Sequence, residues 1–145
     1  MDMKRHLKSA LKQLGFDKPR KAQIIPMNML DAGQDAIVIA ATGSGKQVIY
    51  ETVCLAHSDK LTIVIEPLLA LIYNQVQTLQ AHGIPADYID MTRSKEDIDK
   101  ILNKVRKGKL NFLYVTPERL RNHSFIEAMQ HSDIFMIVAD ECHCI

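Results

Sequence analysis

The sequence predicts an α/β fold in which helices flank an open, mostly parallel sheet. Five short apolar runs alternate along the chain with segments whose apolar residues have helical spacing. The runs are continuously apolar, which is typical of strands that are covered on both faces. Alternation of such strands with helices favours a parallel sheet, because parallel strands are joined by long crossover connections.

The composition indicates one ordinary folded domain. The 145 residues are 47% hydrophobic and 24% charged, with a formal net charge of +1, so no strong overall field points to a nucleic-acid partner. No apolar run approaches the roughly 18 residues of a membrane span, and we expect a soluble protein with no membrane partner. The 3 cysteines form no disulfide or zinc pattern. This usage suits a reducing compartment, the cytoplasm or the nucleus.

The N-terminal part is predicted to be helical. Apolar residues at helical spacing predict a first helix over residues 3–14, which Gly15 ends. A second helix is expected to start near Pro19 and to run to about Leu30. A break or kink is expected near Pro26, because proline removes a backbone donor. Residues 1–33 are therefore a helical lead-in to the rest of the domain.

The other elements follow from apolar patterns and from residues that begin or end helices. Ser94 is expected to cap a helix, with Asp97 three residues later as its acidic partner. Pro117 opens a short helical turn. Strands are expected at residues 36–40, 61–66, 86–90, 110–115 and 134–139, and helices at 46–56, 69–82, 94–107 and 124–130.

The stretch AATGSGKQ, residues 40–47, lies between a predicted strand and a predicted helix. The backbone N–H groups of such a glycine-rich turn bind phosphate oxygens, and the helix N-terminus adds partial positive charge. Gly43 and Gly45 permit the required backbone angles. Lys46 is placed to reach the outer phosphates. The pattern is that of a P-loop.

Two positions of this stretch depart from the P-loop pattern. Ala40 replaces the first glycine, which is a mild change. Gln47 stands where a Ser or Thr hydroxyl usually binds Mg²⁺. A Gln amide oxygen would ligate the ion from a longer and more mobile side chain. We therefore expect weaker binding or slower turnover of Mg²⁺-ATP.

A second stretch carries two carboxylates at the end of an apolar strand. Asp140 and Glu141 follow the run Ile134–Ala139. Ligands of parallel α/β sheets bind beyond the carboxyl ends of strands, so Asp140 and the P-loop are expected to meet in space. Asp140 would hold Mg²⁺, and Glu141 would orient and deprotonate the attacking water in phosphoryl transfer.

The segment ATGSGK followed by DECH resembles superfamily 2 helicases, the DExD/H-box ATPases. The resemblance implies a RecA-like P-loop NTPase domain that uses ATP and Mg²⁺. It implies that Asp140 is the metal ligand. The implied nucleotide-binding residues in the loop are Thr42, Gly43, Ser44, Gly45, Lys46 and Gln47, and the implied catalytic residues are Lys46, Asp140, Glu141 and His143.

Residues 15–19, GFDKP, together with Gln23 resemble the adenine-reading Q motif of this superfamily. A Gln amide can both donate to and accept from the adenine edge. Phe16 and Arg20 are placed to stack on the base. Without the resemblance, this stretch reads as an ordinary helix start.

Two later stretches resemble superfamily segments that contact the nucleic-acid backbone. Residues 66–76, EPLLALIYNQV, resemble motif Ia, and residues 114–120, YVTPERL, resemble a later loop. A hydroxyl and the N–H groups at a helix start suit phosphate. The contacts implied are Pro67, Leu68, Gln75, Thr116, Pro117 and Arg119.

Several details resemble the N-terminal RecA-like domain of RecQ-family DNA helicases more than DEAD-box RNA helicases. These details are PERL at residues 117–120, the spacing to Gln75, and HCI at residues 143–145. The resemblance implies ATP-dependent 3′-to-5′ unwinding, with single-stranded or forked duplex DNA as partner. The alternatives are a DEAD-box-like RNA helicase and, because of Gln47, a non-catalytic nucleotide- or nucleic-acid-binding module. The Q motif and DECH disfavour a P-loop kinase.

Two features set this chain apart from the resemblance. Glu66 stands where RecQ proteins usually have Ser, and a carboxylate there would repel phosphate. The chain also stops just after DECHCI. Residues 1–145 are therefore expected to be a truncated N-terminal RecA-like ATP-binding domain. The second RecA-like domain is missing from this chain, and no unwinding is expected from the chain alone.

Overall fold

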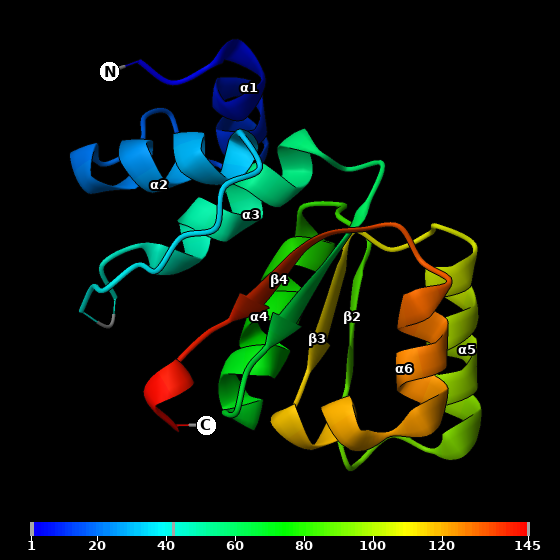
Figure 1. Ribbon diagram of the computed structural model, residues 1–145. Helices are drawn as coiled ribbons and strands as arrows, with labels where there is room; N and C mark the ends of the chain where they lie inside the picture. Colours follow the sequence, from blue (N-terminus) through cyan, green and yellow to red (C-terminus); the bar gives the residue numbers. More distant parts are fainter. Residues whose placement is uncertain (1, 42, 145) are drawn as a thin grey trace. The chain divides into compact units, whose positions relative to one another are not determined.

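Three helices form the N-terminal unit of the chain. The structure, a computed structural model, describes residues 2–41 and 43–144, and its contacts define two units, Met1–His57 and Ser58–Ile145. In the first unit, α1 (Arg5–Gln13) and α2 (Lys21–Asp31) both pack against α3 (Lys46–Ala56) (Figure 1). The apolar residues that predicted the first helix, including Leu7 and Leu11, are buried, and so is Cys54 of α3.

Helix α2 passes through Pro26 without the expected break. The predicted break was wrong, and a kink at Pro26 stays a prediction. The helix continues because proline removes only one hydrogen bond here. Its missing N–H would have bonded the carbonyl of Ala22, and Ala22 is exposed, so that carbonyl has access to water. The helix ends at Asp31, close to the predicted end at Leu30.

A parallel sheet forms the core of the second unit. Its four strands are β1 (Leu61–Ile65), β2 (Ala86–Ile89), β3 (Phe112–Val115) and β4 (Ile134–Ala139), in the order β2-β3-β1-β4 among the described residues. Every pairing is parallel. All residues of β1 and β3 are buried, as the continuous apolar runs predict. The predicted α/β class is confirmed.

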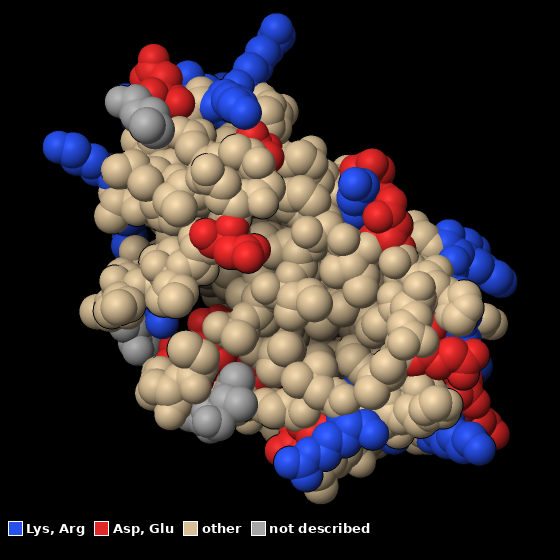
Figure 2. Space-filling view, in the orientation of Figure 1, with Lys and Arg blue, Asp and Glu red and all other residues tan. Residues whose placement is uncertain are grey.

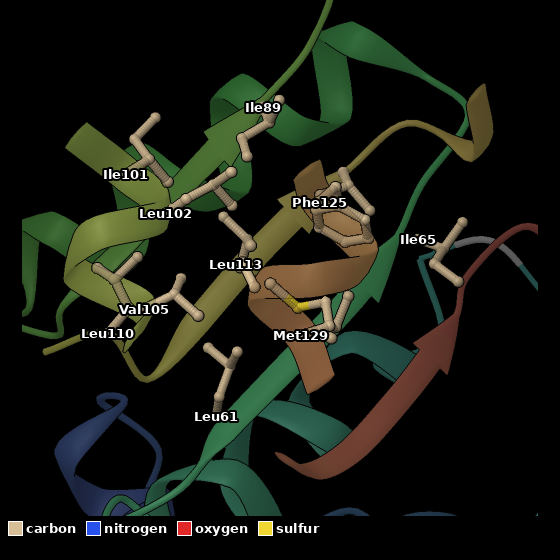
Figure 3. Packing of buried hydrophobic residues seen from close by; sticks show 13 residues of the cluster. Leu61, Ile65, Ile89, Ile101, Leu102, Val105, Leu110, Leu113, Phe125 and Met129 are labelled. Carbon is tan, nitrogen blue, oxygen red and sulfur yellow. The ribbon is translucent and has the colours of Figure 1, made fainter. Parts of the chain in front are cut away.

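Helices cover the two faces of this sheet. On one face, α5 (Lys95–Arg106) and α6 (His123–Gln130) pack together over the strands (Figure 1). On the other face, α4 (Leu69–Ala81) packs against β2 and β3. Tyr73 of α4 contacts Tyr88 of β2. Successive side chains of a strand point to opposite faces, and the next residue, Ile89, belongs to the cluster under α5 and α6. Tyr88 and α4 therefore lie on the other face of the sheet. Figure 3 shows the cluster under α5 and α6, which comprises Leu61, Ile63, Ile65, Ile89, Ile101, Leu102, Val105, Leu110, Leu113, Val115, Phe125, Ala128 and Met129.

The helix starts in the second unit follow the local chemistry of the sequence. Ser94 precedes α5, and its hydroxyl accepts a hydrogen bond from Asp97 N at 3.1 Å, as predicted. Asn122 caps α6 in the same way through Phe125 N, a cap that the sequence reading missed. Two short 3₁₀ helices follow strand ends, η1 (Pro117–Arg121) after β3 and η2 (Cys142–Cys144) after β4.

The strand expected at residues 36–40 is absent. In the described part of the chain this segment pairs with no strand, and Ile37 and Ile39 are 92% and 95% exposed. The apolar run was read correctly as β-prone. However, propensity alone does not make a strand, because strand stability comes from ladder hydrogen bonds and from cover on the faces.

The face drawn in Figure 2 carries no dominant charge of one sign. On the face drawn in Figure 2, basic and acidic side chains are interspersed among uncharged residues, in keeping with the net charge of +1. No helix in the described ranges combines the length and the apolar character needed to cross a membrane.

Candidate nucleotide and nucleic-acid site

The glycine-rich turn of the first unit opens directly into α3. Gly43 and Gly45 have φ values of +79° and +91°, and Gly45 caps the helix that begins at Lys46. Ser44 N donates to Ala41 O at 3.1 Å, which closes the turn. A left-handed turn ahead of a helix N-terminus is the arrangement that binds phosphate groups. The predicted site residue Thr42 lies outside the described residues.

Gln23 ties α2 to this turn. Its Oε1 accepts from Arg20 N at 2.7 Å, and its Nε2 donates to Gly45 O at 2.9 Å. The side chain is 4% exposed. An amide has two donor hydrogens and two acceptor lone pairs, so one of each remains for a ligand. Gln23 thus holds the phosphate turn in place, a role that the sequence reading missed, and its reading of adenine stays a prediction.

Of the other predicted base contacts, Arg20 lies beside Gln23, because its N–H donates to Gln23 Oε1. Phe16 is 45% exposed. The guanidinium of Arg20 reaches the loop, since its Nη1 lies 3.4 Å from the position that a Cβ on Gly45 would take. An exposed aromatic ring and a guanidinium are the groups that stack on bases.

Gln47 is bound within its own helix. Its Nε2 donates to Glu51 Oε1 at 2.5 Å, and the Glu51 side chain is buried. This bond draws the amide along α3 and leaves the Gln47 oxygen as its remaining group for an ion. In the turn itself, the buried Ser44 Oγ has no hydrogen-bond partner among the described residues. A buried hydroxyl without a partner fits a turn that is built around an oxygen-rich ligand.

In the second unit, two paired strands end in carboxylates. Residue Ile65 of β1 is level with Ala139 of β4, and Asp140 N donates to Ile65 O at 3.0 Å. The next residue after β1 is Glu66, which is 0% exposed. Glu66 and Asp140 therefore lie side by side at the carboxyl end of the sheet, where ligands of such sheets bind.

Glu66 is electrostatically the most unusual group of this site. Burial raises the pKa of Glu66, and the nearby charge of Asp140 raises it further, to about 7 against an ordinary value of 4.5. Leu68 N donates to Glu66 Oε1 at 3.2 Å, but Oε2 has no donor partner among the described residues. A shared proton or a cation would satisfy both carboxylates. These oxygens therefore fit a hard divalent ion such as Mg²⁺.

The residues after Asp140 form a strained turn. Glu141 has a φ of +50°, unusual for a residue with a side chain, and its N–H donates to Asp140 Oδ1 at 2.9 Å. The exposed His143 lies with Nε2 3.3 Å from Glu141 Oε2. The three predicted catalytic residues of this turn are thus brought together. Their convergence with Lys46 stays a prediction.

Most of the residues predicted to contact nucleic acid follow two adjacent strand ends. Pro67 and Leu68 follow β1, while Thr116, Pro117 and Arg119 follow β3, and the two strands are paired at Ile65 and Val115. Leu68 is 44% exposed, but Thr116 is 7% exposed. Gln75 is set apart, because it is buried within α4. The five loop residues lie at the same sheet edge as Glu66 and Asp140.

Comparison with known proteins defines the class of this chain. Residues 18–145 match the DEAD/DEAH box helicase family, and the chain belongs to that family. Within it, the chain is 41% identical over 138 residues to the ATP-dependent DNA helicase RecQ of Haemophilus influenzae, a match that covers 94% of this chain and 22% of that protein. It is 37% identical over 132 residues to RecQ of Bacillus subtilis, covering 90% of this chain and 22% of that protein. The predicted resemblance to RecQ helicases is confirmed.

A solved structure agrees with this assignment at the level of the fold. The DUF1998 helicase MrfA bound to DNA and AMPPNP aligns over 98% of this chain and 21% of that chain, with a TM-score of 0.72 and 21% identity. This match supports the predicted RecA-like α/β fold. The chain spans about a fifth of the length of the relatives it matches.

Gly45→Ala is expected to destabilise the first unit more than Gly43→Ala. Both substitutions place a side chain at positive φ, which costs about 1–2 kcal/mol. Only the Cβ on residue 45 would lie 2.5 Å from Gln23 Nε2 and displace its hydrogen bond, adding about 1 kcal/mol. Urea unfolding of both variants measures the difference. Equal losses would show that Gln23 does not depend on Gly45.

Glu66→Gln is expected to stabilise the protein at pH 8. The folded state holds the Glu66 proton more tightly than the unfolded chain, so wild-type stability falls as pH rises from 4.5 to about 7. Glutamine lacks this slope and is expected to gain about 1–3 kcal/mol at pH 8. Urea unfolding at pH 5 and pH 8 without added metal tests this. Glu96→Gln, on the exposed start of α5, should keep the wild-type slope; the idea fails if Glu66→Gln also keeps it.

Proposed function

We propose that this chain is the ATP-binding part of an ATP-dependent DNA helicase of the RecQ type, which unwinds DNA in the 3′-to-5′ direction as a full-length protein. The observation that carries the proposal is the presence of two candidate sites, one in each unit of the chain. One is the left-handed turn that opens α3 at Lys46. The other is the Asp140–Glu141 turn after β4. The sequence identity to RecQ DNA helicases is the reason for proposing DNA, rather than RNA, as the nucleic-acid partner.

The first unit would bind the nucleotide. The N–H groups of the turn at Gly43–Gly45 and the N-terminus of α3 would hold the phosphates, with Lys46 countering the charge of the outer one. Phe16 and Arg20 would stack on the adenine, and Gln23 would use its remaining donor and acceptor on the base edge. The contact between Gln23 and Gly45 O would couple base binding to the position of the phosphate turn.

The second unit would supply the hydrolytic groups. Asp140 would hold Mg²⁺, and Glu66 offers a second oxygen beside it. A bound Mg²⁺ neutralises charge that builds up on the phosphate oxygens. Glu141 would orient the attacking water and take its proton. The exposed His143, at 3.3 Å from Glu141, would hold that carboxylate in position.

The DNA would run along the sheet edge formed by the loops after β1 and β3. The side chain of Arg119 suits phosphate, while Leu68 offers an exposed apolar surface for a sugar or base. Thr116 is buried, so its part would be to shape the loop. The partner is single-stranded or forked duplex DNA, and a second RecA-like domain would complete the motor. A reducing compartment, the cytoplasm or the nucleus, suits the exposed Cys142 thiol.

One observation favours a second candidate function, a nucleotide- or nucleic-acid-binding module without turnover. The Gln47 amide nitrogen is held by Glu51, so the position that usually gives Mg²⁺ a hydroxyl has an amide oxygen at best. In that case nucleotide affinity would be kept and hydrolysis would be lost. A DEAD-box-like RNA helicase is the third candidate.

The full-length protein is expected to hydrolyse ATP faster with single-stranded DNA than with RNA of the same length. Glu141→Gln should lower the DNA-stimulated rate by about 10²-fold or more, because it removes the base but keeps the shape. Steady-state phosphate release measures both effects. Glu127→Gln, on the exposed side of α6, is the matched control and should leave the rate unchanged. Stronger stimulation by RNA would favour an RNA helicase, and a rate insensitive to Glu141→Gln would favour the binding module.

Gln47→Thr is expected to raise the ATPase rate of the full-length protein, because it returns a hydroxyl to the Mg²⁺ position. The substitution also removes the hydrogen bond to Glu51, so thermal unfolding must be measured in parallel. Gln47→Ala loses the same bond without supplying the hydroxyl and is the matched control. Absence of any gain by Gln47→Thr over both wild type and Gln47→Ala would refute the idea that Gln47 limits Mg²⁺ use.

A further inference from the structure

Three helices of the first unit meet at one carboxylate that the proposed helicase chemistry does not use. Asp31, the last residue of α2, has a side chain that is 2% exposed. His6 Nε2 of α1 and His57 Nε2, at the end of α3, approach the same oxygen, Asp31 Oδ1, at 2.6 and 2.9 Å. Lys4 Nζ lies 3.2 Å from the other oxygen. The two histidines are 25 and 26 residues from Asp31 in sequence, so only the packing of the helices creates this cluster.

The donor atoms of this cluster suit a transition metal. One carboxylate oxygen and two imidazole nitrogens all lie within 4.8 Å of one another. Zn²⁺ and similar ions are bound by such mixed nitrogen and oxygen sets, whereas Mg²⁺ and Ca²⁺ require more oxygen ligands. The rings of His6 and His57 stand edge to face, with centroids 6.1 Å apart, so their Nε2 atoms converge without stacking.

The carboxylate is ionised and ready to ligate. Burial by itself would raise the pKa of Asp31, but hydrogen bonds from His6, His57 and Lys4 outweigh it and hold the pKa at about 2. Lys4 occupies Oδ2 and leaves Oδ1 to the two histidines. His6 and His57 side chains are 45% and 29% exposed, so the open side of the cluster is accessible to an ion from solvent.

We propose that His6, Asp31 and His57 form a binding site for one divalent transition-metal ion, Zn²⁺ being the best fit, which fastens α1 and α2 to the end of α3. Each ring must present the Nε2 lone pair to the ion, so a proton on Nε2 moves to Nδ1 of a neutral ring or is released to solvent from a charged one. Ligands about 2.0–2.1 Å from a tetrahedral Zn²⁺ are about 3.3 Å apart, so the nitrogens must withdraw from the oxygen by less than about 1 Å. The exposed His6 ring permits this movement, and water takes the fourth position.

The site differs in kind from the one proposed for Mg²⁺. That site consists of carboxylate oxygens on Asp140 and Glu66 and contains no imidazole in its metal set. A hard ion therefore prefers the second unit and a borderline ion prefers the first. Binding of Zn²⁺ at Asp31 is separable from nucleotide hydrolysis, and its failure would leave the proposed function intact.

The test is a titration of the full, untagged chain with Zn²⁺ and with Co²⁺ after removal of metals by chelation. Isothermal titration calorimetry is expected to give one Zn²⁺ per chain, and Co²⁺ is expected to show the enhanced visible absorption of a tetrahedral site. Zn²⁺ should also raise the unfolding temperature, since an ion that binds only the folded state stabilises it. Mg²⁺ should not compete at equal concentration.

Variants separate a metal site from a cluster that is only hydrogen-bonded. His6→Gln and His57→Gln keep an N–H donor for Asp31, so the fold is retained, but they remove the imidazole and should weaken Zn²⁺ binding by on the order of tenfold or more each. His82→Ala and His131→Ala are matched controls. Each of these exposed rings has its Nδ1 beside a carbonyl of its own helix, far in sequence from the cluster, and neither change should alter binding.

Lys4→Gln is expected to change the affinity for Zn²⁺ in the opposite direction. It removes a positive charge beside the shared carboxylate and should tighten Zn²⁺ binding severalfold, while Lys8→Gln, on an exposed part of α1, should not. The proposal is overturned if Zn²⁺ does not bind at micromolar concentration, or if the affinity and stoichiometry are the same in wild type, His6→Gln and His57→Gln.

Discussion

The pairing of β1 with β4 is the contact on which the second unit depends. Strand β1 is hydrogen-bonded on one side to β3 and on the other to β4, so it fixes the register of both neighbours. Its ladder continues past the strand, where Asp140 N donates to Ile65 O. Because all three strands run in the same direction, every residue that follows them is brought to one edge. The carboxylates and the proposed DNA loops owe their proximity to this register.

That proximity has an electrostatic cost that the site must resolve. Two carboxylates in contact, Glu66 and Asp140, cannot both be ionised without a proton or a cation between them. RecQ proteins usually carry Ser at the position of Glu66, and a hydroxyl at the position of Gln47. This chain therefore has an extra carboxylate, Glu66, beside the proposed Mg²⁺ ligand Asp140, and it lacks a hydroxyl at position 47.

In the first unit, α3 is the central element on which the others pack, as β1 is the strand with which its neighbours pair in the second. Helices α1 and α2 pack on α3, and both of its ends are tied to other helices. At its start, Gln23 of α2 binds Gly45 O; at its end, His57 meets Asp31 of α2. The glycine-rich turn therefore opens a helix whose two ends are both anchored. A metal ion at Asp31 would stiffen the anchor at the far end of α3.

Local patterns in the sequence were sufficient for the α/β class, the helix caps at Ser94, and the four strands that formed. They were also sufficient for the glycine turn and the Asp140–Glu141 pair, because continuous apolar runs, caps and positive-φ glycines act over a few neighbouring residues. The predictions from sequence were wrong for the strand at residues 36–40 and for the break at Pro26. There the outcome depends on whether a segment pairs with another strand and whether a carbonyl is accessible to water. Those questions are not local.

The sequence by itself determined the chemical groups that are available: a glycine-rich turn, two carboxylates after a strand, and the likeness to RecQ helicases. Only the tertiary structure decided which groups meet. Glu66 was visible as an odd carboxylate, but its contact with Asp140 required parallel pairing of strands about seventy residues apart. His6, Asp31 and His57 gave no signal at all, since nothing in their spacing marks them as neighbours. These three residues come together because α1 and α2 pack on α3, and such long-range packing cannot be predicted from any short stretch of sequence.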